Sequence, residues 1–151
     1  MDRLNVGGLI AMLVALASCS APAPEGPVAC SERQDGAIVT IGTTRDNPRD
    51  RVALWITDAA FINQALADLA AGDGRPSHHP MFGRVLDGRD CDAERAWHVE
   101  PASASWTEMS TEECDATAEF VSANLASWIA RPTPNWCPWH GRVLSVDDRR
   151  P

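Results

Sequence analysis

Residues Trp136-Cys137-Pro138-Trp139 form a short segment in which two large aromatic side chains flank a thiol and a proline. Aromatic residues make up only 6% of the chain, so this concentration is unusual. Pro138 fixes its own backbone and favours an extended conformation at Cys137. The segment is therefore predicted to be a rigid element that buries a large apolar area and holds the thiol between two indoles.

A long helix is predicted before this segment. Ser110 and Glu113 have the spacing of a capping box, in which each side chain bonds to the backbone of the other residue. Apolar residues then recur at steps of four, three, four and three: Cys114, Ala118, Val121, Leu125 and Trp128. This stripe predicts one helix of about five turns. Arg131 and Pro132 are expected to end it.

The N-terminus has the pattern of a bacterial lipoprotein. A short apolar run, residues 6–17, is too short for a comfortable membrane span. It ends Leu16-Ala17-Ser18-Cys19, which resembles the lipobox that precedes a lipidated cysteine. We expect residues 1–18 to be a lipoprotein signal peptide and Cys19 to carry acyl chains, more than one of which gives stable anchoring. The alternative is an ordinary signal peptide with an incidental cysteine.

Two further features concern location. Ser20, rather than aspartate, follows the lipidated cysteine, which predicts export to the outer membrane in a cell with two membranes. Residues 19–29 contain Pro22, Pro24 and Pro27 and are expected to form a semi-extended tether before one domain, residues 30–148. The formal charge of -8 argues against nucleic acid or an anionic membrane surface as the partner.

The domain alternates strand and helix patterns. Strands are expected at residues 37–41, 52–56, 82–86, 96–100 and 142–146, with a short additional strand within residues 103–107. Thr57 or Asp58 is expected to cap a helix that ends at Gly72. This order predicts an α+β two-layer sandwich, with a mainly antiparallel sheet and both helices on one face.

The second half of the chain resembles a family of small exported bacterial domains. Residues 98–101 read His-Val-Glu-Pro, residues 112–116 read Glu-Glu-Cys-Asp-Ala, and the Trp-Cys-Pro-Trp segment follows with Arg142 after it. Members are often labelled calmodulin-binding, after a eukaryotic protein that shares the domain at its N-terminus. The resemblance covers roughly residues 37–146 and implies no particular activity. Residues 90–95, Asp-Cys-Asp-Ala-Glu-Arg, depart from the Asn and Trp that the family usually has there.

The calmodulin label does not fit the charges of this chain. Calmodulin is acidic and binds basic amphipathic helices. The helix expected after Thr111 instead begins with Glu112, Glu113 and Asp115. Calmodulin binding is therefore not expected here.

Four cysteines remain after lipidation of Cys19, and an even number in an oxidising compartment indicates two disulfides with three possible pairings. The family has Cys114 and Cys137 together, so the resemblance implies that these two are bonded. Cys30 and Cys91, which are specific to this chain, would then form the second bond.

Catalytic and metal sites are the alternatives to a binding role. Cys137 with His140 could form a thiol nucleophile, and His98 with Glu112 or Asp115 could act as an acid-base pair. His78 and His79 with Asp73 could bind a transition metal, although adjacent histidines between prolines are typical of a solvated loop. We expect no cofactor and no metal.

The leading hypothesis is a lipid-anchored, non-catalytic binding module whose protein or small-molecule partner is unknown. Trp136 and Trp139 either pack around the disulfide or form an aromatic binding surface. Because tryptophan and arginine are enriched at binding hot spots, Trp139 with Arg142 is the candidate contact patch. His98 is either a further contact residue or a hydrogen-bonded structural histidine.

Overall fold

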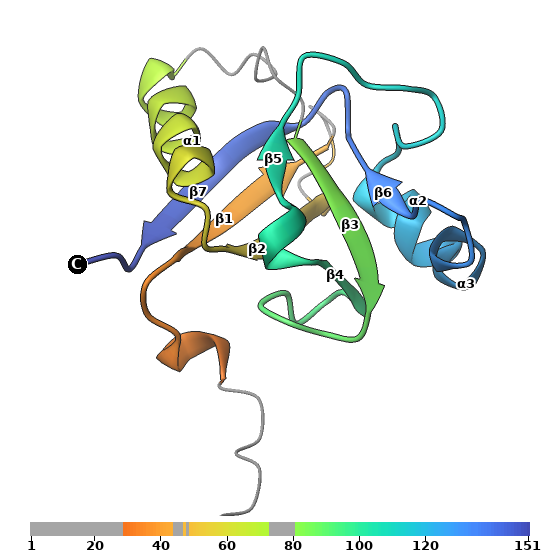
Figure 1. Ribbon diagram of the computed structural model, residues 1–151, viewed down its shortest axis with the longest axis horizontal. Coiled ribbons are helices and arrows are strands. Elements are labelled where there is room, and N and C mark those ends of the chain that lie inside the picture. Colours follow the sequence, from red (N-terminus) through yellow and green to blue (C-terminus); the bar gives the residue numbers. More distant parts are fainter. Residues whose placement is uncertain (1–28, 44–46, 48, 73–80) are drawn as a thin grey trace, which may run out of the picture.

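The computed structural model describes residues 29–43, 47, 49–72 and 81–151, and Figure 1 shows their arrangement. The predicted signal peptide, the lipidation site at Cys19, most of the tether and the His78-His79 pair lie outside these residues. The elements are η1 Cys30–Glu32, β1 Ala37–Gly42, β2 Arg51–Ile56, α1 Ala59–Ala71, β3 Met81–Asp87, β4 Trp97–Val99, η2 Pro101–Ser103, β5 Ser105–Trp106, α2 Ala118–Ala123, α3 Leu125–Ile129, β6 Asn135–Trp136 and β7 Arg142–Asp148.

The first sheet has three antiparallel strands in the order β2-β1-β7. Residue 37 pairs with both Ile56 and Asp148, so β1 is central and joins the start of the domain to its end. A bulge between Thr40 and Ile41 shifts the register of β1 against β7. Val39 and Ile41 are buried on the inner face, as the alternation of a half-buried strand requires.

The second sheet is built around β3. Val85 pairs with Val99 of β4, and Phe82 pairs with Ser105 of β5, so β4 and β5 accompany different parts of β3. Gly83 pairs with Trp136 of β6. A Cβ atom at Gly83 would overlap the side chain of Val99, so the strands need glycine at this close approach.

Helix α1 forms as the sequence predicts and joins the two sheets. Asp58 caps its first turn by accepting a hydrogen bond from the amide of Phe61 (2.7 Å), and Gly72 ends it with a left-handed φ of 66°. Trp106 of β5 stacks on Phe61 at 4.2 Å between ring centroids and donates its indole N–H to the Phe61 carbonyl. Figure 1 shows α1 beside β7, on the opposite side of the molecule from α2 and α3.

Two buried tryptophans attach α2 and its preceding segment to the second sheet. Trp97 and Trp136 are completely buried and meet edge to face, with 5.3 Å between their ring centroids. The indole of Trp97 donates to the Ser122 hydroxyl, and that of Trp136 donates to the Ala116 carbonyl, both at 2.8 Å. Each ring therefore buries apolar area while its single polar group is satisfied.

The prediction of one continuous five-turn helix after Ser110 is wrong. Residues 111–114 make one turn only, and α2 begins at Ala118 with Thr117 as its cap. In a continuous helix the Cys114 carbonyl would accept from the Ala118 amide. Here it accepts from the Cys137 amide (2.9 Å), and Ala118 donates to the Thr43 hydroxyl instead. The tertiary partners of Cys114 thus divide the segment.

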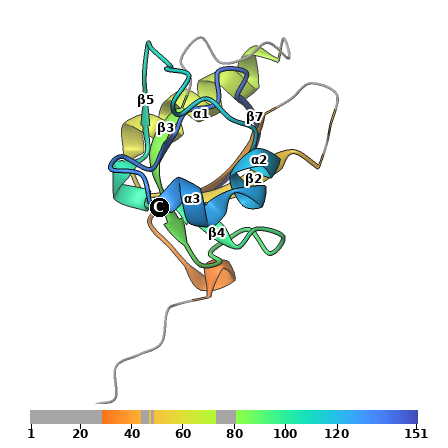
Figure 2. The same cartoon turned by 90° about the vertical axis from the view of Figure 1, so that its right-hand side faces the viewer.

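The apolar stripe survives this division. Ala118, Val121 and Trp128 are buried, and Leu125 packs against the core although the helix is interrupted at Asn124. Figure 2 shows α2 and α3 as two short helices on the face turned towards the viewer. The periodicity therefore identified the buried positions correctly, while the capping box and the helix length were misinterpreted.

The class predicted from sequence is confirmed as an α+β fold with antiparallel sheets and two disulfides. In detail the strands are divided between two sheets, and α1 and α3 pack chiefly against β7 and β3, respectively. The short strand β6 was not expected, because two residues in a segment between prolines give no readable alternation. Among the described residues, no helix has the length and apolar character needed to span a bilayer.

Candidate functional site

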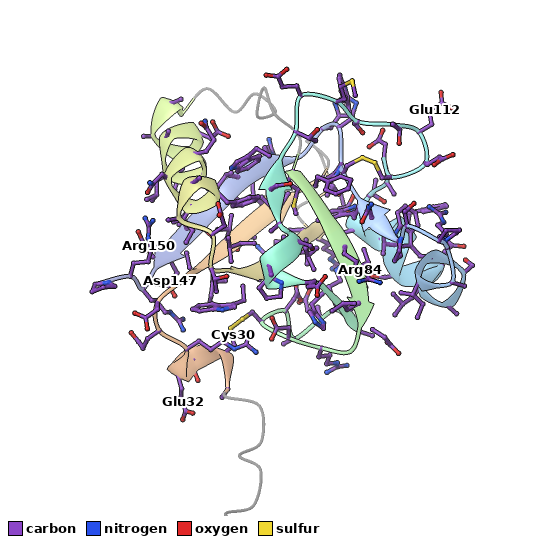
Figure 3. The ribbon with its side chains drawn as sticks, viewed as in Figure 1. Cys30, Glu32, Arg84, Glu112, Asp147 and Arg150 are labelled. Carbon is purple, nitrogen blue, oxygen red and sulfur yellow. A yellow bond between two sulfur atoms is a disulfide. The ribbon has the colours of Figure 1, made fainter. Side chains whose placement is uncertain are left out.

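Both predicted disulfides form, Cys30–Cys91 and Cys114–Cys137. They are visible as yellow bonds near Cys30 and on the loop that carries Glu112 in Figure 3. Cys137 is fully buried, and its carbonyl accepts a hydrogen bond from the Ser110 hydroxyl (2.9 Å). Because the sulfur of Cys137 is bonded to Cys114, it is not available as the nucleophile that a Cys137–His140 pair would need.

The two tryptophans of the motif have different environments. Trp136 is fully buried, whereas Trp139 is 50% exposed. The amide of Trp139 donates to the Asp115 carboxylate (2.8 Å), and the amide of Gly141 closes a turn on the Pro138 carbonyl (2.9 Å). Trp136 therefore packs in the core, while Trp139 is presented to solvent on a backbone held by a disulfide, a proline and two hydrogen bonds.

An open pocket of about 610 Å³ lies beside this turn. Asp115, whose carboxylate accepts the hydrogen bond from the Trp139 amide, is one of the residues that line it. We call it the acidic pocket, and define it by Glu112, Glu113, Asp115, Phe120, Trp128 and Arg131. It thus combines three carboxylates, two aromatic rings and one guanidinium.

Arg131 lies across the inner wall of the acidic pocket. Its guanidinium carbon is 3.8 Å from the centroid of the Trp128 ring, and it donates a hydrogen bond to the Glu113 carbonyl (2.7 Å). Phe120 meets the Trp128 ring edge to face and is 52% exposed. Sequence reasoning treated Arg131 only as a helix stop and missed this role. The stacking on Trp128 is a contact between residues three apart and could have been inferred from that spacing, whereas the hydrogen bond to Glu113 depends on a loop 18 residues earlier in the chain.

The structure does not bring together the proposed acid-base pair. His98 lies opposite Leu86 near the end of β3, and its Nδ1 hydrogen-bonds the Gly88 carbonyl (2.8 Å). The loop with Glu112 and Asp115 follows β5, which pairs near the start of β3. Leu86, which pairs with His98, and Phe82, which pairs with Ser105 of β5, are therefore about 13 Å apart along β3 at the usual strand rise. Among the described residues, no hydrogen bond or ion pair joins His98 to either carboxylate.

The segment that departs from the family pattern, residues 90–95, is part of the framework of the fold. Asp90 pairs with the Arg33 guanidinium, and Asp92 accepts a hydrogen bond from the Ala53 amide (2.9 Å) at the outer edge of β2. Arg95 is buried and donates to the Arg51 and Arg49 carbonyls and to a serine of α2. The segment therefore closes the edge of β2 that would otherwise be unpaired.

Arg142, the other member of the predicted contact patch, begins β7 opposite Gly42 and is half-buried, with its Nε atom enclosed. Trp139 is thus the more accessible of the two residues. Their role in binding stays a prediction.

Metal binding has no described candidate. Within residues 29–43, 47, 49–72 and 81–151, no group of three histidine, cysteine or acidic residues is placed to hold a metal ion.

A carboxyl with a clearly shifted pKa lies at the end of β7, away from the acidic pocket. There, a side-chain hydrogen bond from Arg150 lowers the pKa of Asp148 below its usual value of 3.8.

These features define the class of the protein as a small, disulfide-stabilised α+β domain with an exposed tryptophan beside an acidic pocket. A family model described as the BP-74 N-terminal domain matches residues 37–149. The match spans most of the chain, so the protein belongs to the BP-74 N-terminal domain family. The matched segment includes every described strand but not Cys30, so one disulfide reaches outside it. No curated protein and no solved structure matches the chain.

Proposed function

We propose that this protein is a lipid-anchored, non-catalytic binding module of the bacterial cell envelope. Acyl chains on Cys19 hold it at the membrane, which is the outer membrane where two membranes are present. The proline-rich residues 19–29 extend the domain away from the lipid surface. Its partner is a protein or small molecule in the same compartment, and neither calmodulin nor nucleic acid.

The presentation of Trp139 carries this proposal. A half-exposed indole is the kind of side chain that dominates binding energy when it enters a partner's pocket. Its backbone is fixed by the Cys114–Cys137 disulfide, Pro138 and the Asp115 carboxylate, so little conformational freedom is lost on binding. A side chain that served only the core would be buried, as Trp136 is.

The anchor is tested by cell fractionation and intact mass. The wild-type protein is expected in the membrane fraction, with a mass that includes acyl chains on Cys19. Cys19→Ala is expected to abolish the added mass and to release the protein from the membrane fraction. A wild-type protein with no acyl mass would contradict the lipid anchor.

The binding surface is tested with Trp139→Ala, using Leu69→Ala as a matched control. Leu69 is also an exposed apolar side chain, 40% accessible, but it lies on α1. Crosslinked partners in envelope extracts are expected to be lost with Trp139→Ala and kept with Leu69→Ala, while both variants keep the wild-type melting transition. Equal capture by both variants would remove Trp139 from the contact surface.

A further inference from the structure

We propose that the acidic pocket binds an arginine side chain presented by the partner protein on a basic segment. This inference rests on the proposed binding function and names the chemistry of its partner. It is carried by the charge of the pocket, by a guanidinium that the pocket already holds, and by aromatic surface that the fold leaves open.

The carboxylates of the pocket are available for a cation. Within the described part of the chain, the carboxylates of Glu112 and Glu113 make no hydrogen bond or ion pair, and both side chains are exposed. Figure 3 shows Glu112 projecting outward from its loop. By contrast, Asp115 holds the Trp139 amide. Two free negative charges at the rim favour a positively charged ligand.

The inner wall shows which cation fits. The Arg131 guanidinium stacks on the Trp128 ring at 3.8 Å and donates to the Glu113 carbonyl. An aromatic face together with a carbonyl acceptor is an environment that suits a planar guanidinium better than a compact ammonium. Arg131 therefore occupies, from within the chain, the kind of place that an incoming arginine would take.

Two aromatic features of the pocket are not used by the fold. Phe120 contacts the Trp128 ring but is still 52% exposed. The exposed face of Phe120 is open to the aliphatic stem or the guanidinium of a ligand. Trp128 is 1% exposed, and its indole N–H has no hydrogen-bond partner among the described residues. A ligand that displaces Arg131 from the ring would change the surroundings of this indole.

The pocket adjoins Trp139, because Asp115 belongs to the pocket and binds the Trp139 amide. A partner segment with an arginine in the pocket could therefore place an apolar residue against Trp139. The two contacts would form one surface around the Cys114–Cys137 disulfide.

The test is a titration of the full chain, in nonionic detergent, with the capped peptide Gly-Arg-Gly-Arg-Gly and with its lysine counterpart. Heat of binding gives the affinity, and the Trp128 indole N–H resonance reports the place. We expect the arginine peptide to bind several-fold more tightly than the lysine peptide and to shift this resonance. Added salt should weaken binding.

Charge variants locate the interaction. Glu112→Gln with Glu113→Gln is expected to weaken the arginine peptide about fivefold, in line with exposed ion pairs. Glu32→Gln removes an exposed charge near Cys30, far from Glu112 in Figure 3, and should leave the affinity unchanged. Arg131→Gln removes the competing guanidinium and should bind the peptide about fivefold more tightly.

Equal affinity for the two peptides, equal effects of the Glu32 and Glu112/Glu113 variants, or an unmoved Trp128 resonance would each overturn the arginine assignment. So would unchanged or weaker binding by a folded Arg131→Gln variant. Because the outcome of the titration depends neither on acylation of Cys19 nor on an extracted partner, its failure is separable from that of the proposed function. Loss of partner capture in Trp139→Ala without arginine binding would leave the binding module standing with a different ligand chemistry.

Discussion

Residues 88–96 and residues 107–117 are both irregular loops that follow strands of the second sheet, and each contains one cysteine of a disulfide. In the first loop, Asp90, Asp92 and Arg95 all bond to neighbouring segments of the fold. In the second loop, Glu112 and Glu113 keep free carboxylates, as described above. A disulfide thus holds each loop, but the charged side chains of the first are paired within the fold, whereas Glu112 and Glu113 of the second are exposed to solvent.

The two loops differ in whether their charged side chains are paired within the fold. A charged side chain that is buried must be paired, because an unpaired buried charge is costly. A charge that stays exposed on a rigid loop contributes little to stability and is available for contact. Substitution of the paired charges of the first loop should therefore affect unfolding, whereas substitution of Glu112 and Glu113 in the second loop should affect mainly binding.

The largest effect should follow removal of the first disulfide. Cys30→Ala with Cys91→Ala is expected to lower the free energy of unfolding by about 4 kcal/mol, because the bond closes a chain segment with a sequence separation of 61. Urea unfolding followed by tryptophan fluorescence measures the loss. The comparison would fail if this pair cost less than the other disulfide.

Removal of the second disulfide should have a smaller effect on stability. Cys114→Ala with Cys137→Ala is expected to lower the free energy of unfolding by about 3 kcal/mol, since the sequence separation is only 23. Amide hydrogen exchange should also increase in residues 107–117 but not in residues 88–96. Uniform exchange in both loops would show that the disulfide does not hold the second loop specifically.

Loss of the buried guanidinium should rank next. Arg95→Met keeps most of the side-chain length but leaves the carbonyls of Arg49 and Arg51 without their donor, so the free energy of unfolding should fall by about 2 kcal/mol. Arg89→Met, at an exposed arginine of the same loop, is the matched control and should change it by less than about 0.5 kcal/mol. A similar loss in both variants would refute a special role for Arg95.

The smallest effect should come from the second loop's free charges. Glu112→Gln with Glu113→Gln is expected to change the free energy of unfolding by less than about 0.5 kcal/mol. Asp90→Asn, which weakens the pair with Arg33, should cost about 1 kcal/mol in the same urea assay. A larger loss from the glutamate pair than from Asp90→Asn would reverse the distinction between the two loops.

Much of this fold could be predicted from local patterns. Helix α1 begins after Asp58 and ends at Gly72 as predicted, because both signals act on backbone groups within a few residues. The strands β1, β2, β3 and β7 coincide with alternating or continuous apolar runs. The disulfide pairs were also correct, although the choice among three pairings depended on the family resemblance rather than on spacing.

The candidate site was predicted only in part. Trp139 was identified from its residue type and neighbours, but its exposure follows from the turn of Gly141 on Pro138 and the bond to Asp115. The acidic pocket was not predicted, since it needs the loop of Glu113 to lie beside Arg131, 18 residues later in the chain.

The sequence by itself determined the α+β class, the main strands, α1 and the buried stripe of Ala118, Val121 and Trp128, because these depend on periodicity and on short-range capping. Only the tertiary structure decided where the second helical region begins, how the strands divide into two sheets, and which tryptophan is exposed. The Cys114 carbonyl illustrates the reason. It accepts from Cys137 instead of the next helical turn, and a backbone group committed to a distant partner cannot also satisfy its local pattern.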